Sequence, residues 1–74
     1  MTGRVVVRLN TDIEVGFDTS YMFMFEADFS DPDGSVKLNV WLDSRGYDTK
    51  EYILKNLLEY KKFLDAYKRN ALNH

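Results

Sequence analysis

The chain lacks cysteine, and its only histidine is His74, the last residue. Without cysteine it can form neither a disulfide nor a thiolate metal site. Without a histidine inside the chain, the usual pairs of nucleophile and general base cannot be assembled. A terminal histidine is expected to fray rather than to hold a catalytic geometry. We therefore expect a protein that is not an enzyme, with no catalytic residues, no cofactor and no bound metal.

Glycine and proline are also scarce, with four glycines and one proline. None of the glycines lies in a glycine-rich turn between a strand and a helix, so the chain has no phosphate-binding loop. The N-terminal apolar run between Arg4 and Arg8 is only three valines, too short for a signal-peptide core or a membrane span. These features, with the absence of cysteine, predict a cytoplasmic protein that does not bind membranes.

One segment invites comparison with a calcium-binding loop. Asp31, Asp33 and Gly34 match positions 3, 5 and 6 of an EF-hand loop. The first and last ligand positions would then be Phe29 and Val40, which cannot supply a carboxylate. The match fails, and the segment is instead typical of a turn, because proline presets φ and glycine accepts a left-handed backbone.

What the chain does contain is enough apolar material to fold. Its 74 residues form one domain at most, 45% of them are hydrophobic, and 15% are aromatic. The net charge of −2 is unevenly distributed. Residues 1–49 carry nine carboxylates against four basic groups, whereas residues 50–74 carry six basic groups against three acidic ones. We expect a single domain over residues 1–74 with an acidic first part and a basic last part.

Apolar and polar residues alternate from residue 4 to residue 43, as in half-buried strands. Turn-forming residues interrupt the alternation at positions 10–12, 18–20 and 31–34. The pattern predicts four antiparallel strands at about 4–9, 13–17, 21–29 and 35–43. Their expected inward side chains are Val5, Val7, Leu9, Ile13, Val15, Phe17, Tyr21, Phe23, Phe25, Ala27, Phe29, Val36, Leu38, Val40 and Leu42.

The register of the last hairpin depends on the length of its turn. A four-residue loop over 31–34 gives outer-face pairs of better matched chemistry, and we favour it. It pairs Phe25 with Val40, Phe29 with Val36, Met24 with Trp41, and Asp28 with Lys37. A two-residue turn at Asp33-Gly34 would instead place Trp41 opposite Glu26.

A helical period begins near residue 49 and predicts a helix over about 49–70. Asp48 is a suitable N-cap, and Glu51 three residues later completes a capping-box pattern. The expected apolar stripe contains Ile53, Leu57, Tyr60, Leu64, Tyr67 and Ala71, flanked by Leu54 and Phe63.

The predicted architecture is α+β, a four-stranded antiparallel meander with one long C-terminal amphipathic helix packed on one face. Four strands form a sheet roughly 15–20 Å wide, and one helix is only about 10 Å across. The helix therefore leaves part of the apolar sheet face uncovered. Either the sheet curls around the helix, or a second copy or a partner covers the remainder, and we expect homodimerisation on this ground.

The outer face of the predicted sheet offers one binding surface. Its apolar residues are Met22, Met24 and Trp41, an arrangement similar to the apolar centre and charged rim of an interface. The alternative is that a Met–Trp pair stabilises the sheet, or that a bulge turns Trp41 inward. The charged residues expected around it are Glu26, Asp28 and Lys37.

Two further surfaces follow from the charges. An acidic one could imitate the phosphates of nucleic acid and occupy a basic groove of a target protein, although aspartates also simply mark turns. Its residues are Asp12, Glu14, Asp18, Asp31 and Asp33. A basic one on the helix could contact nucleic acid, although it equally fits a solvated helix face. Its residues are Lys50, Lys55, Lys61, Lys62, Lys68 and Arg69.

These features favour a small non-catalytic protein-binding module, an inhibitor or regulator of a larger protein. In size and character the chain resembles small inhibitors encoded by bacteriophages and mobile elements, including anti-CRISPR proteins, nucleic-acid mimics and immunity proteins. This resemblance carries no motif and assigns no functional residue. The alternative function is a nucleic-acid-binding accessory protein that uses the basic C-terminal helix.

Overall fold

The computed structural model describes residues 3–72 and contains five strands, a 3₁₀ turn and one helix in that part of the chain. The strands pair into two antiparallel sheets, β1–β2 and β3–β4–β5. The elements are β1 (Arg4–Arg8), β2 (Glu14–Asp18), η1 (Thr19–Tyr21), β3 (Met24–Asp28), β4 (Val36–Trp41), β5 (Thr49–Leu54) and α1 (Leu57–Leu72). The predicted α+β class with one C-terminal helix is confirmed, whereas the four-stranded meander is wrong.

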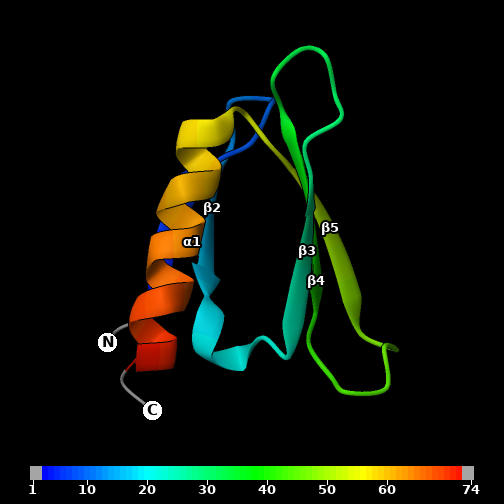
Figure 1. Cartoon of the computed structure of the whole chain (residues 1–74), viewed down its shortest axis with the longest axis vertical. Helices are drawn as coiled ribbons and strands as arrows, with labels where there is room; N and C mark the ends of the chain where they lie inside the picture. Colours follow the sequence, from blue (N-terminus) through cyan, green and yellow to red (C-terminus); the bar gives the residue numbers. More distant parts are fainter. Residues whose placement is uncertain (1–2, 73–74) are drawn as a thin grey trace.

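The elements form two layers. One contains α1 and the β1–β2 hairpin, with α1 lying along β1, and the other is the three-stranded sheet (Figure 1). The layers meet at one end, where the Lys55 N–H donates to the Arg8 carbonyl oxygen (3.0 Å) and the Asn10 N–H donates to the Ile53 carbonyl oxygen (2.9 Å). At the other end the chain crosses between the layers through η1 (Figure 1). The strands thus form two sheets that face each other. This arrangement covers more apolar area than one flat meander would.

Phe63 of α1 is the side chain that joins the layers. It is completely buried, and its ring lies edge-on to Phe17 of β2 (centroids 5.7 Å apart) and to Phe25 of β3 (5.0 Å apart). Edge-to-face aromatic pairs of this kind are favourable beyond the area that they bury. The other buried hydrophobic residues around it are Val7, Val36, Leu38, Val40 and Leu54.

The predicted β3–β4 register is confirmed. Phe25 pairs with Val40, and Met24 pairs with Trp41. The turn has the expected chemistry, because the Gly34 N–H donates to the Asp31 carbonyl oxygen (3.2 Å) and Gly34 adopts a φ of +90°. A four-residue turn therefore sets which β4 side chains face the core.

The predicted helix start is wrong, because residues 49–54 form β5 instead. β4 is a central strand, and β5 supplies the hydrogen-bonding partner for its second edge. Asp48 does not cap a helix, since its carbonyl oxygen accepts from the Leu42 N–H (2.8 Å). The residue that caps α1 is Asn56, whose Oδ1 atom accepts from the Glu59 N–H (3.1 Å). The predicted helix therefore combines a strand and the shorter helix that follows it.

The predicted burial of strand residues is wrong at the turns. Ile13, Tyr21, Phe23 and Phe29 are exposed rather than buried. Residues 19–21 form a 3₁₀ turn, in which the Asp18 Oδ1 atom accepts from the Ser20 N–H (3.1 Å), so the strand alternation does not extend through them.

The predicted apolar stripe of the helix is also displaced. Leu57 and Ala71 are exposed, whereas Phe63 and Ala66 are buried and Tyr60 is half-buried. The predicted stripe includes Ile53 and Leu54 of β5, so positions that are not helical partly set its phase.

A buried carboxylate on α1 was not anticipated. Glu59 is only 8% exposed, and its Oε1 atom accepts from the Arg8 backbone N–H (2.8 Å), while its Oε2 atom lies 3.2 Å from the Lys62 Nζ atom. The hydrogen bond from Arg8 is the main cause that lowers the pKa of the Glu59 carboxyl. Glu59 thus accepts a hydrogen bond from the Arg8 N–H, which lies on the edge of β1 that has no partner strand.

We predict that Phe63→Ala lowers the free energy of unfolding by about 3–5 kcal/mol, because it leaves a cavity between the layers. Urea denaturation followed by far-UV circular dichroism measures the change. Lys61→Ala, at an exposed position of the same helix, is the control and should change stability little. Equal effects of the two substitutions would contradict the central position of Phe63.

We predict that Glu59→Gln destabilises the protein at pH 7 by about 1 kcal/mol, because a neutral amide accepts the Arg8 N–H less strongly. The pKa of Glu59 is lower in the folded state than its ordinary value of 4.5, so the carboxylate's contribution is complete above that value. It is lost as the pH falls through the lower, folded-state pKa. Urea titrations at several pH values should show the two proteins converging under acidic conditions; a difference unchanged at low pH would contradict this.

Candidate interaction surface

The outer face of the three-stranded sheet is the surface on which most of the predicted binding residues lie. α1 and the β1–β2 hairpin are both on the other side of this sheet (Figure 1). The strand registers place its outward side chains in three rows across β3, β4 and β5. The rows are Met24–Trp41–Thr49, Glu26–Asn39–Glu51 and Asp28–Lys37–Ile53. One row is therefore apolar at two positions, and the other two carry three carboxylates and one lysine.

Met24 and Trp41 are directly opposite each other, as predicted. Met24 is 40% exposed, and Trp41 is half-buried. The loop from β4 to β5 lies beside the indole: Gly46 has a φ of +78°, and a Cβ atom added there would be 3.7 Å from the Trp41 Cδ1 atom. The loop is held by hydrogen bonds from the Tyr47 N–H to Asp43 (3.0 Å) and from the Thr49 hydroxyl to the Gly46 carbonyl (3.1 Å). The loop thus supports one side of the indole, and Met24 lies across the strand pair on the other.

Glu26, Asp28 and Lys37 are exposed beside this pair, also as predicted. Asp28 is opposite Lys37, and hydrogen bonds from Ser30 are the main cause that lowers the pKa of the Asp28 carboxyl. Glu26 is opposite Asn39 and therefore lacks a cation directly across the strand pair. The rim of the apolar pair is acidic overall.

Met22 does not belong to this face. It is half-buried and packs against the core, because η1 ends at Tyr21 and the regular strand begins only at Met24. The structure instead exposes Tyr21 (76%) and Phe23 (56%), which strand alternation assigned to the core. The turn residues at 18–20 were the sequence signal that the alternation is interrupted before this segment.

Each of the five predicted acidic residues accepts a hydrogen bond or forms an ion pair with a neighbouring side chain or backbone group. Asp12 pairs with Lys55, and Glu14 pairs with Arg8 (3.0 Å). Asp18 receives the Ser20 N–H described above. The remaining two hold the β3–β4 turn: the Ser35 hydroxyl donates to Asp31 (3.1 Å), and the Ser35 N–H donates to Asp33 (2.8 Å). Hydrogen bonds from Lys55, Ser20 and Ser35 are the main causes that lower the pKa of Asp12, Asp18 and Asp33 respectively.

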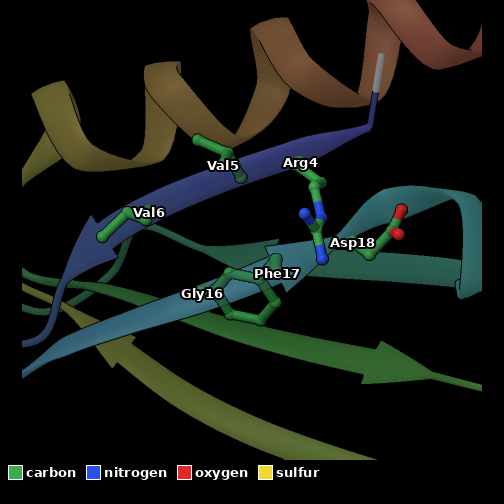
Figure 2. A pocket seen from close by; sticks show the side chains of 6 residues that line it. All are labelled: Arg4, Val5, Val6, Gly16, Phe17 and Asp18. Atoms are coloured by element: carbon green, nitrogen blue, oxygen red, sulfur yellow. The ribbon is translucent and has the colours of Figure 1, made fainter. Parts of the chain in front are cut away.

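A shallow depression of about 400 Å³ lies on the β1–β2 hairpin (Figure 2). Gly16 leaves this space, because nothing lies within 4 Å of where its Cβ atom would be. The two charged side chains beside it, Arg4 and Asp18, are directly opposite each other in the strand pair. This pair supplies one cation and one anion, which is ordinary cross-strand chemistry rather than a set of groups converging on a ligand.

Within residues 3–72, no three His, Cys, Asp or Glu side chains come together in a group that could hold a metal ion. In the same part of the chain, no helix is both long and apolar enough to cross a membrane. Comparisons with protein-family models, curated proteins and solved structures found no match to this chain.

We predict that Gly46→Ala destabilises the protein by about 1–2 kcal/mol, because an L side chain is disfavoured at a left-handed φ. Gly16→Ala is the matched control: its added methyl group meets open space, and alanine in a strand is favoured over glycine by about 0.5–1 kcal/mol. Thermal unfolding of both variants measures the difference. Tryptophan emission should shift only for Gly46→Ala, since this loop shields the indole; equal spectra would contradict that role.

Proposed function

We propose that the protein is a small non-catalytic protein-binding module that inhibits or regulates a larger protein. The observation that carries this proposal is the Met24–Trp41 pair, a partly exposed apolar centre on a sheet face with a charged rim. Tryptophan is enriched among the residues that dominate binding energy, and methionine adapts to irregular partner surfaces. The protein supplies such a centre without burying it against its own helix.

The charge around the pair defines the kind of target that fits. Two rows of the sheet face carry Glu26, Asp28 and Glu51 against the single Lys37. Complementary potentials raise association rates and exclude wrong partners, so the target surface should be basic at its rim and apolar at its centre. This matches the character of the small phage and mobile-element inhibitors that the chain resembles in size.

The basic helix is less suited to the alternative function, binding nucleic acid. Of the basic residues predicted on this helix, Lys50 lies in β5 and Lys55 lies between β5 and α1. Two of the predicted lysines already have acidic partners, since Lys55 pairs with Asp12 and Lys62 pairs with Glu59. A nucleic-acid interface also favours exposed aromatic side chains beside the cations. The aromatic side chains of α1 are directed to the core, where Phe63 and Tyr67 contact Phe25.

The test is capture of a partner from a host-cell lysate by the tagged protein, at moderate and high salt and with nuclease treatment. We predict that Met24→Glu and Trp41→Glu each weaken capture about 30-fold or more, as expected for central interface residues. Leu58→Glu, at a position of α1 that is 63% exposed, changes the net charge by the same amount and should retain the partner. Circular dichroism and urea titration of each variant establish that it is folded.

Two outcomes would overturn the proposal. Capture unchanged in Met24→Glu and Trp41→Glu would remove this face as the binding surface. Recovery of nucleic acid, or of proteins that disappear after nuclease treatment, would support the basic-helix function instead. Sedimentation of the purified protein tests the separate expectation of homodimerisation.

A further inference from the structure

β3 forms one edge of the three-stranded sheet (Figure 1). The hydrogen bond from the Leu42 N–H to the Asp48 carbonyl oxygen continues the β4–β5 ladder between directly opposite residues. Backbone groups of successive residues point to opposite edges of a strand, so the odd-numbered residues of β4 bond to β3. Their partners are the even-numbered residues of β3. The N–H and C=O groups of Phe25 and Ala27 therefore point away from the sheet.

This edge is open. Among residues 3–72, no hydrogen bond reaches the outward backbone groups of Phe25 and Ala27. Natural edge strands are usually protected by lysine, proline or a covering element, because such groups otherwise pair with another chain. β3 has neither lysine nor proline, and α1 packs on its inner face through the ring contacts of Phe25 with Phe63 and Tyr67.

Exposed aromatic side chains lie at both ends of the edge. Phe23 precedes β3 and is 56% exposed, and Phe29 follows it and is 55% exposed. Phe29 also contacts Tyr60 of α1, with ring centroids 5.2 Å apart. An added strand would therefore find apolar contacts on the inner side of the edge. On the outer side it would find Glu26 and Asp28.

We propose that β3 binds an extended segment of the partner protein as an additional strand. Side chains of that segment alternate between basic residues on the outer side, across from Glu26 and Asp28, and apolar residues on the inner side, across from Phe25 and Ala27. Cross-strand neighbours of opposite charge are favourable, and backbone hydrogen bonds to the two free residues supply affinity. This inference rests on the proposed function and adds the chemistry of the segment recognised.

The charge of β3 disfavours a second copy of this chain as the occupant. An antiparallel β3–β3 pair centred on Glu26 would place two glutamates opposite each other, and one centred on Ala27 would place Glu26 opposite Asp28. The third register, centred on Phe25, would place Glu26 opposite Met24 and would give the carboxylates no cation. Like charges directly opposite are destabilising. A basic partner strand removes this repulsion in every register.

The probe is a synthetic peptide that alternates lysine and valine, compared with a peptide that alternates glutamate and valine. We expect the lysine peptide to bind about tenfold more tightly or better, and to slow amide hydrogen exchange at Phe25 and Ala27. Methylating the backbone nitrogens of alternate residues in the lysine peptide should weaken binding about tenfold, without any change to the protein. Equal binding of the two peptides, or no added protection at these amides, would overturn the proposal.

Ala27→Pro provides the complementary change in the protein. Proline at this position removes only an outward N–H and leaves the β3–β4 ladder intact, as edge strands tolerate. Ala27→Ser keeps the N–H and is the matched control. Ala27→Pro should lose the lysine peptide and the lysate partner, and Ala27→Ser should retain both.

The two proposals fail separately. A lysate partner that is lost with Met24→Glu but retained with Ala27→Pro would overturn strand addition and leave the protein-binding function standing. A partner retained by both variants would overturn both. A dimer of the purified protein that Ala27→Pro dissociates would show that β3 pairs with a second copy, against the charge argument.

Discussion

The insertion of Phe63 between Phe17 and Phe25 connects elements that no continuous hydrogen-bond ladder joins. The two sheets share backbone hydrogen bonds only near Arg8–Asn10 and Ile53–Lys55 within the described residues 3–72, so their remaining contact is between side chains. Because the Phe63 ring contacts both layers, aromatic packing sets the distance between them. Glu59, one turn earlier on α1, holds the helix to β1 through the Arg8 N–H. Together these residues place the helix on the hairpin side and leave the opposite face of the three-stranded sheet uncovered.

The uncovered face and the open edge of β3 belong to the same strand. Met24, Glu26 and Asp28 present side chains on the face, while Phe25 and Ala27 present backbone groups at the edge. A partner that paired with the edge would also lie beside the apolar pair and its acidic rim. Affinity from backbone hydrogen bonds and selectivity from side chains would then come from five consecutive residues.

The strand pattern and the register of β3 with β4 were predictable because both depend on local signals: alternation, and a turn whose length is marked by Asp31, proline and Gly34. The start of α1 was not predictable, because Ile53 and Leu54 satisfy either a helical or a strand period and only the need of β4 for a second partner decides between them. The exposure of Tyr21 and Phe23 depends on η1, whose three residues shift the alternation. The Met24–Trp41 pair could be found from sequence, whereas the open backbone of β3 requires knowing that β2 pairs with β1 and not with β3.

The burial of Phe63 and Glu59 also has a consequence for how the chain folds. β1 is among the first segments in chain order, yet the acceptor for its edge N–H and the ring that fills the space behind it both come from α1, the last element described. The chain must close a long loop before contacts between such distant positions can form. The entropy cost of closing the loop slows folding. During synthesis Val7 and Phe17 of the N-terminal hairpin therefore lack their contacts with Phe63 until the helix has emerged from the ribosome.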